Sequence, residues 1–190
     1  DPVDIQILNE YKKIFKSKNL DFEIEDSKLF LLSNEEIKEY GDNNKKYINR
    51  DFYRWIRTKK NILMKDNEPI GGKWSFDSDN RNPFEKNYKE DIKFKNFNNK
   101  FVKEARDYIL KNFEKNPGET DLYLPIDFSG SKKRFRKFLK EKLKNFGKYQ
   151  DAVKDDVYFG YHSILSPMIN IGLLDPNYIV TESEKFYKNN

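Results

Sequence analysis

The sequence predicts an α/β to mostly α fold in which strands are confined to the first third of the chain. Apolar residues recur with a helical period through most of the sequence, whereas short apolar runs bounded by turn residues occur only before position 75. Residues 73–91 are rich in Asn, Asp and Pro and show no periodic pattern of apolar residues. We therefore expect an α/β part over residues 1–73, an ordered linker over residues 74–94 and a helical part over residues 95–190.

The opening segment combines a helix start with strand-like runs. Asp1-Pro2 suits an N-cap and a first helical position, and apolar residues within 3–15 form one helical stripe. Apolar and acidic residues alternate over 20–24, and a second apolar run covers 28–32. These patterns predict a helix of about four turns followed by two short strands.

A capping signal and a hairpin signal follow. Ser33 and Glu36 stand at the spacing of a capping box, which predicts a short helix that stops at Gly41. Residues 45–60 carry aromatic and basic residues at helical spacing, giving an aromatic face and a cationic face. Two apolar runs flank a polar centre within 62–70, which predicts a β-hairpin.

The glycine pair Gly71-Gly72 predicts backbone turns, because no Lys-Ser/Thr follows at the spacing of a phosphate loop. The linker beyond it is rich in aromatic side chains, so we expect it to pack onto the protein rather than move freely. Those aromatic residues are Trp74, Phe76, Phe84 and Tyr88. Polar contacts that fix the linker are expected from Asp77, Asn80 and Arg81.

The remainder of the chain has the pattern of a helical domain. We expect a helix over 97–113, a connection over 122–131 and a helix over 135–146 that Gly147 closes. The last segment, 149–187, is predicted to be helical with breaks at Pro167 and Asp175-Pro176.

Composition narrows the classes of function. There is no Cys and one His, so disulfides, thiol nucleophiles and an iron-sulfur or zinc site are not expected from this chain. The 16 Phe and 12 Tyr predict an aromatic core. The net charge of +5 fits nucleic-acid binding or, alternatively, the amino-acid bias of an AT-rich gene. Without a long apolar run or a signal peptide, we expect a soluble, intracellular, cytoplasmic protein with no membrane partner.

A second informative stretch runs from His162 to Pro167. Its two serines flank a predicted helix start, where free amides and hydroxyl groups favour a bound anion such as a phosphate. The alternative is that Ser166 is an ordinary N-cap.

Several motifs in order resemble the deoxyribodipyrimidine photolyase-related proteins, the iron-sulfur bacterial branch of the photolyase and cryptochrome family. The resemblance spans nearly the whole chain, and it implies the distal part of a Rossmann-like α/β antenna domain, an ordered linker and the first helices of an FAD-binding domain. The motifs are residues 52–54, 62–64 and 71–81, residues 146–152, residues 162–167 and residues 170–176.

The resemblance also implies an FAD site, of which this chain holds the phosphate side. The implied cofactor-binding residues are Tyr149, His162, Ser163, Ile164, Leu165, Ser166 and Asn170. In the complete protein the family implies light-driven repair of UV-damaged DNA or light sensing, an antenna chromophore and a 4Fe-4S cluster. Neither the cluster, nor any other metal site, nor catalytic residues are expected here. The resemblance implies a partial chain that lacks the N-terminal βαβ unit and most of the C-terminal FAD-binding domain, and a separately encoded C-terminal half is one way to complete it.

Two other classes of protein stay open. The chain could be a non-catalytic remnant of a decayed gene, or a basic, aromatic module that binds single-stranded nucleic acid without a cofactor. Packing beside the flavin phosphates is favoured over general-base catalysis for His162, and packing in the core is favoured over electron relay for Trp55 and Trp74. The basic clusters at 54–60 and 132–137 fit either solvated helix faces or phosphate contacts.

Overall fold

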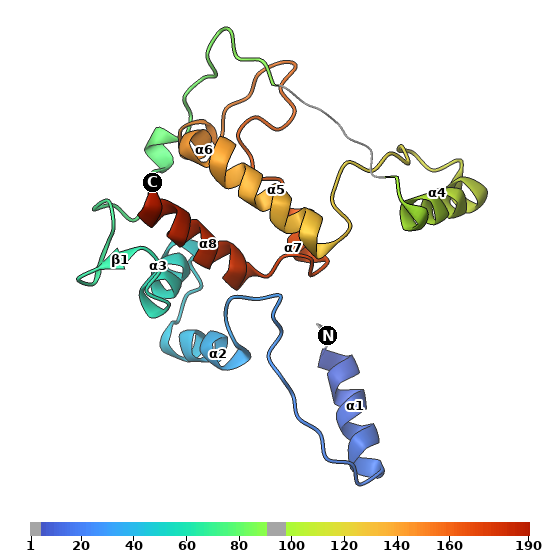
Figure 1. Ribbon diagram of the computed structural model, residues 1–190. Helices are drawn as coiled ribbons and strands as arrows, with labels where there is room; N and C mark the ends of the chain where they lie inside the picture. Colours follow the sequence, from blue (N-terminus) through green and yellow to red (C-terminus); the bar gives the residue numbers. More distant parts are fainter. Residues whose placement is uncertain (1–4, 91–97) are drawn as a thin grey trace.

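The computed structural model describes residues 5–90 and 98–190, which are mostly helical with one small sheet. Asp1-Pro2 and Phe97, on which two helix starts were predicted, lie outside these ranges. Figure 1 shows α5 beside α8 in the centre, with α1 and α4 set apart from this body. The elements are α1 (Ile5–Ser17), α2 (Asn34–Asn43), α3 (Asn49–Lys59), β1 (Met64–Lys65), β2 (Glu68–Pro69), η1 (Asp77–Asp79), α4 (Lys100–Phe113), α5 (Phe128–Glu141), α6 (Leu143–Tyr149), α7 (Ser166–Asn170) and α8 (Pro176–Asn189).

The capping box before α2 is confirmed. The amide of Glu36 donates to the Ser33 hydroxyl at 3.1 Å, and the Ser33 amide donates to the Glu36 carboxylate at 2.9 Å. The helix continues past Gly41 to Asn43, because a glycine inside a helix weakens it without ending it.

The predicted hairpin is confirmed at β1 and β2, which pair antiparallel with Met64 opposite Pro69. Asp66 and Asn67 connect the strands with φ of 52° and 62°, the left-handed pair that a tight two-residue hairpin turn requires. The amide of Leu63, just before β1, donates to the Glu184 carboxylate of α8 at 2.9 Å. This bond ties the hairpin to the last helix.

The strands predicted at 20–24 and 28–32 are wrong. Both segments are irregular, and the side chains of Leu20, Phe22 and Ile24 are 54%, 42% and 54% exposed. A strand needs a neighbour to satisfy its backbone groups, and the sheet in the described ranges consists of β1 and β2 alone. The Rossmann-like part of the expected fold is therefore not confirmed.

The helices of the second half differ from the predicted bounds. Asp127 caps α5 by accepting from the Gly130 amide at 2.6 Å, so the helix begins inside the stretch that was predicted to be a connection. Gly147 does not close a helix but lies within α6. Residues 150–165 are irregular rather than helical, and helical structure resumes only with α7 and α8.

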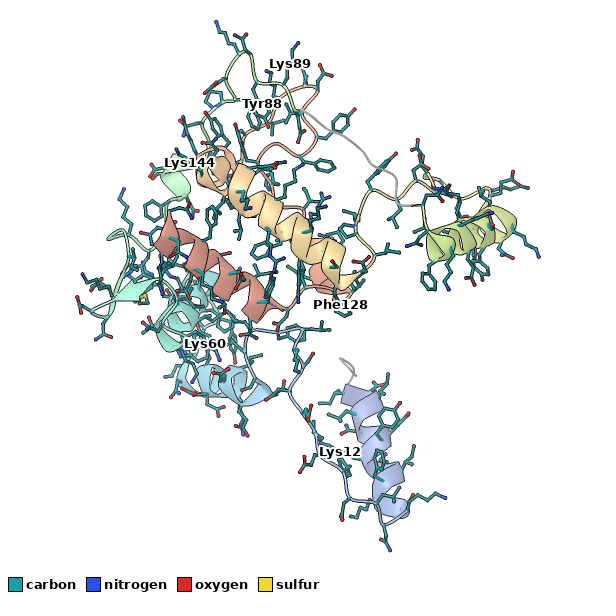
Figure 2. The ribbon with its side chains drawn as sticks, in the orientation of Figure 1. Lys12, Lys60, Tyr88, Lys89, Phe128 and Lys144 are labelled. Atoms are coloured by element: carbon teal, nitrogen blue, oxygen red, sulfur yellow. The ribbon has the colours of Figure 1, made fainter. Side chains whose placement is uncertain are left out.

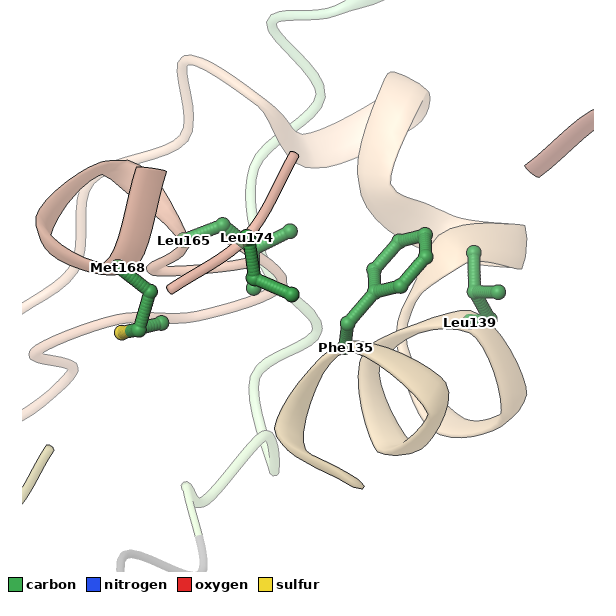
Figure 3. Packing of buried hydrophobic residues seen from close by; sticks show 5 residues of the cluster. All are labelled: Phe135, Leu139, Leu165, Met168 and Leu174. Atoms are coloured by element: carbon green, nitrogen blue, oxygen red, sulfur yellow. The ribbon is translucent and has the colours of Figure 1, made fainter. Parts of the chain in front are cut away.

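The core lies where α5 meets the segment around α7 (Figure 3). It contains one aromatic ring, that of Phe135, so the prediction of an aromatic core is wrong for the centre. Its members are Phe135, Leu139, Leu165, Met168 and Leu174. Partly buried rings, among them Phe138, Tyr178 and Phe186, surround this cluster.

Trp55 packs with Tyr40 and Phe52 in a second aromatic group, at centroid distances of 4.9 Å and 5.8 Å. This contact agrees with the packing role expected of that tryptophan. Within the described ranges, none of the helices combines the length and the apolar character needed to cross a membrane.

Candidate cofactor-phosphate site

The predicted cofactor residues lie on three consecutive segments: the end of α6, the irregular stretch 150–165 and the short helix α7. Tyr149 and Leu165 are buried, Ser163 and Ile164 are half-buried, and His162, Ser166 and Asn170 are exposed. The site therefore has buried supports and an exposed polar side.

Tyr149 lies inside a stack of rings drawn from the linker and the 150–165 stretch. Its ring stacks on Phe84 at 5.4 Å and on Tyr161 at 5.2 Å, and Tyr88 completes the group. The expectation that linker aromatics pack onto the protein is confirmed for Phe84 and Tyr88. With 6% of its surface exposed, Tyr149 supports the loop through its ring.

The imidazole of His162 is held by the backbone. Its Nε2 lies 2.8 Å from the carbonyl oxygen of Gln150, and its ring meets Phe146 edge to face at 5.8 Å. A carbonyl oxygen only accepts, so Nε2 carries the proton and Nδ1 is the acceptor in the neutral ring. This bond fixes the start of the serine stretch against α6.

Ile164 has a backbone conformation that β-branched residues rarely adopt, with φ at 53°. Such strain persists only where the surroundings impose it, and it is frequent at ligand-binding loops. The next residue, Leu165, is 5% exposed and belongs to the core cluster, so the strained residue directly precedes a core anchor. The Leu165 side chain is thus a core contact.

The amides of the serine stretch have no acceptors within the part of the chain that the structure describes. None of the hydrogen bonds found there is donated by the backbone of residues 163–166 or by the hydroxyl groups of Ser163 and Ser166. Ser166 is the first residue of α7, while Leu165 occupies the N-cap position without a side-chain bond. The alternative that Ser166 is an ordinary N-cap is therefore wrong.

Two contacts that sequence reasoning missed hold the linker against this loop. The Glu90 carboxylate accepts from the amides of Tyr158 and Phe159 at 2.8 Å and 3.0 Å, and it lies 3.7 Å from the Lys142 ammonium. Lys142 also donates to the carbonyl of Gly160 at 2.6 Å. Burial lowers the pKa of Lys142 from its ordinary value, and the Glu90 charge partly opposes that shift.

The second missed contact is an ammonium group that three carbonyls surround. Lys154 Nζ donates to the carbonyls of Tyr88, Lys86 and Glu85 at 2.9 Å, 3.1 Å and 3.4 Å. Of the predicted linker contacts, the Arg81 guanidinium lies 3.8 Å from the Asp151 carboxylate, and the Asn80 carbonyl accepts from the Asp151 amide at 3.1 Å. The single signal for these contacts in the sequence is the run of linker aromatics.

Figure 2 shows the side chains around this region, with Tyr88 at the linker and Lys144 on α6. No cluster of three or more metal-ligating side chains occurs within residues 5–90 and 98–190. The serine stretch offers consecutive amides and two hydroxyl groups that have no acceptor among the described residues, while the imidazole of His162 is already bound to the Gln150 carbonyl.

A sequence model of the deoxyribodipyrimidine photo-lyase-related proteins matches residues 1–123, more than half of the chain. The chain belongs to this family. This photolyase-related chain is also similar to a (6-4) photolyase of Agrobacterium fabrum, with 28% identity over 188 residues that cover 98% of the chain and 37% of that photolyase. An uncharacterized protein of Acanthamoeba polyphaga mimivirus is 39% identical over 85 residues, which are 43% of each protein. The chain thus spans less than half the length of these relatives.

Proposed function

We propose that this chain forms the phosphate side of an FAD site in a photolyase-like flavoprotein. The observation that supports the proposal best is the serine stretch, where the consecutive amides of 163–166 and two hydroxyl groups have no acceptors among the described residues. An anion at this position would receive several hydrogen bonds at once. The match to the (6-4) photolyase extends over this part of the chain, whereas the family match ends at residue 123.

Each predicted residue has a part in this proposal. Ser163 and Ser166 donate hydroxyl bonds to the pyrophosphate, and Ile164 and Leu165 present their amides. His162 positions the stretch through Gln150, Asn170 faces the cofactor one turn further on, and Tyr149 supports the loop from below. FAD bound here would supply electron transfer to a lesion in DNA, or a response to light.

The rest of the complete protein belongs to the same proposal. Residues 1–73 would be the distal part of a Rossmann-like antenna domain, residues 74–94 the interdomain linker, and residues 95–190 the start of the FAD-binding domain. The chromophore and the 4Fe-4S cluster would be held outside this chain, with a C-terminal half completing the flavin site. The protein would act in the cytoplasm.

UV-damaged DNA is the proposed partner of the complete protein, and the outer face of α5 and α6 supports it. Exposed cations recur every three or four residues along α5 and again along α6. They are Lys133, Lys137, Lys140, Lys144 and Lys148. Duplex phosphates would neutralise them and release counterions, so binding through this face would weaken steeply with salt.

Amide chemical shifts test the cofactor proposal directly. Titrating the isotope-labelled chain with ADP, and separately with inorganic pyrophosphate, should shift the amide signals of residues 163–166 first. The double substitution Ser163→Ala and Ser166→Ala should weaken ADP binding about tenfold, the equivalent of one or two charge-assisted hydrogen bonds. Ser129→Ala, which alters an exposed serine of α5, is the matched control.

A chain whose 163–166 signals stay unchanged at millimolar ADP and pyrophosphate would contradict the proposal. That result would favour the non-catalytic remnant. Salt-sensitive binding of a single-stranded oligonucleotide without any ADP response would favour the cofactor-free nucleic-acid module instead.

A further inference from the structure

A cavity lies between α3, residues 74–80 and parts of α6 and α8. Its volume is about 910 Å³, which is in the range of sites for small organic ligands. We call it the Trp74 cleft, after the indole in its wall. None of the predicted cofactor residues is among the described residues that line it, although Gln150, whose carbonyl holds His162, is one of them.

Aromatic side chains that are only partly covered form one wall of the Trp74 cleft. Trp74 is half-buried, while Tyr53 and Phe76 are 50% and 51% exposed. Large rings that stay exposed beside a cavity offer flat faces on which a planar ring can stack. This wall therefore suits a planar aromatic group.

Arginine side chains from one helix form the cationic side. Arg50, Arg54 and Arg57 are spaced four and three residues apart on α3, so they share a helix face, and all three line the cleft. Asp77 is the carboxylate among the lining residues. The cleft therefore has an excess of positive charge.

The arginines of the cleft differ in whether their guanidinium groups are already engaged in contacts. Arg57 is occupied, because it donates to the carbonyls of Ile62 and Leu63 at 3.3 Å and 3.0 Å. Arg54 is exposed, its guanidinium lies 5.5 Å from the Trp74 centroid, and it forms no ion pair within the described part of the chain. Arg54 is thus a cation without an ion pair beside the Trp74 ring, over which Arg57 also lies at 5.4 Å.

A buried acceptor completes the lining. Asn80 is 7% exposed, and its buried Oδ1 has no hydrogen-bond partner among the described residues, although its backbone is anchored to Asp151. A buried oxygen without a partner is unfavourable, and an N–H donor from a ligand would satisfy it. The cleft thus combines stacking rings, a free cation and an acceptor that faces no donor.

We propose that the Trp74 cleft binds a nucleotide. The base would stack on the aromatic wall and donate an N–H to Asn80 Oδ1, while the phosphate would pair with Arg54. Arg50, whose Nε lies 3.3 Å from the Asp51 carboxylate, would join only by exchanging that partner. A neutral aromatic compound would leave Arg54 without an anion, and a plain phosphate would leave the rings and Asn80 without a partner. Two sources offer this chemistry, a free mononucleotide and a nucleotide within a single strand.

Fluorescence of 2-aminopurine tests the proposal, because this base has an exocyclic amino group and loses emission when it stacks on an aromatic ring. The probes are its riboside 5′-monophosphate, the riboside without phosphate, and a single strand of thymidines with one 2-aminopurine. We expect saturable quenching by the chain and about tenfold weaker binding of the riboside, since it lacks the phosphate. Whichever phosphorylated probe saturates at the lower concentration identifies the source.

Substitutions separate the cleft from other surfaces. Arg54→Gln should weaken binding of the monophosphate about tenfold and leave that of the riboside unchanged. Phe76→Leu, at an exposed position, should reduce the quenching without unfolding the chain. Lys59→Gln removes one cation from α3 outside the cleft, where it pairs with Glu39 at 2.6 Å, and should change neither.

The result that would overturn the proposal is the absence of saturable quenching with both phosphorylated probes, or quenching that Arg54→Gln and Phe76→Leu leave intact. The indole signal of Trp74 distinguishes this site from the cofactor proposal. Nucleotide binding that shifts the amide signals of residues 163–166 but not the indole signal of Trp74 would contradict the cleft proposal and support the phosphate site. A shift of the indole signal alone would support the cleft proposal and contradict the phosphate site.

Discussion

The ring of Phe84 lies on the ring of Tyr149 with the two planes 8° apart. One ring belongs to the linker and the other to the end of α6, so this stack fixes the linker against the candidate phosphate loop. Gly160 closes the stack from another side, since a Cβ added there would lie 2.8 Å from Phe84 Cζ.

Gly160→Ala should therefore destabilise the chain by about 1–3 kcal/mol, because the new methyl group meets Phe84 and because φ is 50° at this position. Urea unfolding followed by circular dichroism measures the change. Gly147→Ala is the matched control: a Cβ there meets nothing within 4 Å, so the helix should gain up to about 1 kcal/mol. Equal effects of the two substitutions would refute the role of the stack.

Ile164→Asn tests the strain in the serine stretch. Asn tolerates a positive φ better than Ile, so relief of strain should offset part of the apolar contact that is lost, leaving a net cost of about 1 kcal/mol or less. Ile169→Asn, at a half-buried residue of α7 that packs on the core, should cost at least about 2 kcal/mol. The comparison uses the free energies of unfolding in urea, and a larger loss at Ile164 would show that the loop is not strained.

Glu36→Gln should remove a pH-dependent part of the stability. Bonds from Lys60 and then from the Ser33 amide lower the pKa of Glu36 from its ordinary value of 4.5. The unfolded chain then binds more protons between the two pKa values, so this contribution is present above about pH 4.5 and is lost as the pH falls through the folded pKa.

Screening by solvent limits how much the Glu36 carboxylate contributes to the free energy of unfolding. Glu36 and Lys60 are 21% and 31% exposed, so we expect a loss of about 1 kcal/mol at pH 7 and a smaller difference near pH 3. Thermal unfolding at both pH values measures it. Glu35→Gln, at an exposed neighbour that does not cap the helix, should change stability by less than about 0.5 kcal/mol.

Lys154→Met should loosen the linker, because the carbonyls of Glu85, Lys86 and Tyr88 lose their shared donor. We expect trypsin to cut after Lys86 and Lys89 several-fold faster, as found by mass spectrometry of timed digests, since proteolysis follows local opening. Lys144→Met, on the exposed side of α6, should leave the rate at these sites unchanged. An unaltered rate in Lys154→Met would mean that other contacts hold the linker.

The sequence predicted the elements that depend on interactions between residues close to one another in the chain. The capping box of Ser33 and the hairpin at 64–69 depend on bonds within a few residues, and both are confirmed. The glycine pair, with φ of 90° and 70°, likewise forms the predicted turns. The helix at α3 follows from its amphipathic period.

Structure that depends on distant partners could not be predicted in the same way. Residues 20–24 alternate like a strand, but no neighbour pairs with them within the described ranges. The stretch 150–165 contains helix-compatible residues, yet Glu90 takes the amides of Tyr158 and Phe159 from a position nearly 70 residues away. Of the candidate site, the sequence predicted the serine stretch, but neither its linker support nor the anchoring of Leu165 in the core.

The bond between the Leu63 amide and the Glu184 carboxylate spans 121 residues. During synthesis the amide emerges from the ribosome long before its acceptor exists, so water must solvate it in the meantime. The hairpin that follows Leu63 can reach its final position only after α8 has been translated, so the seating of this early segment waits for a partner 121 residues later in the chain.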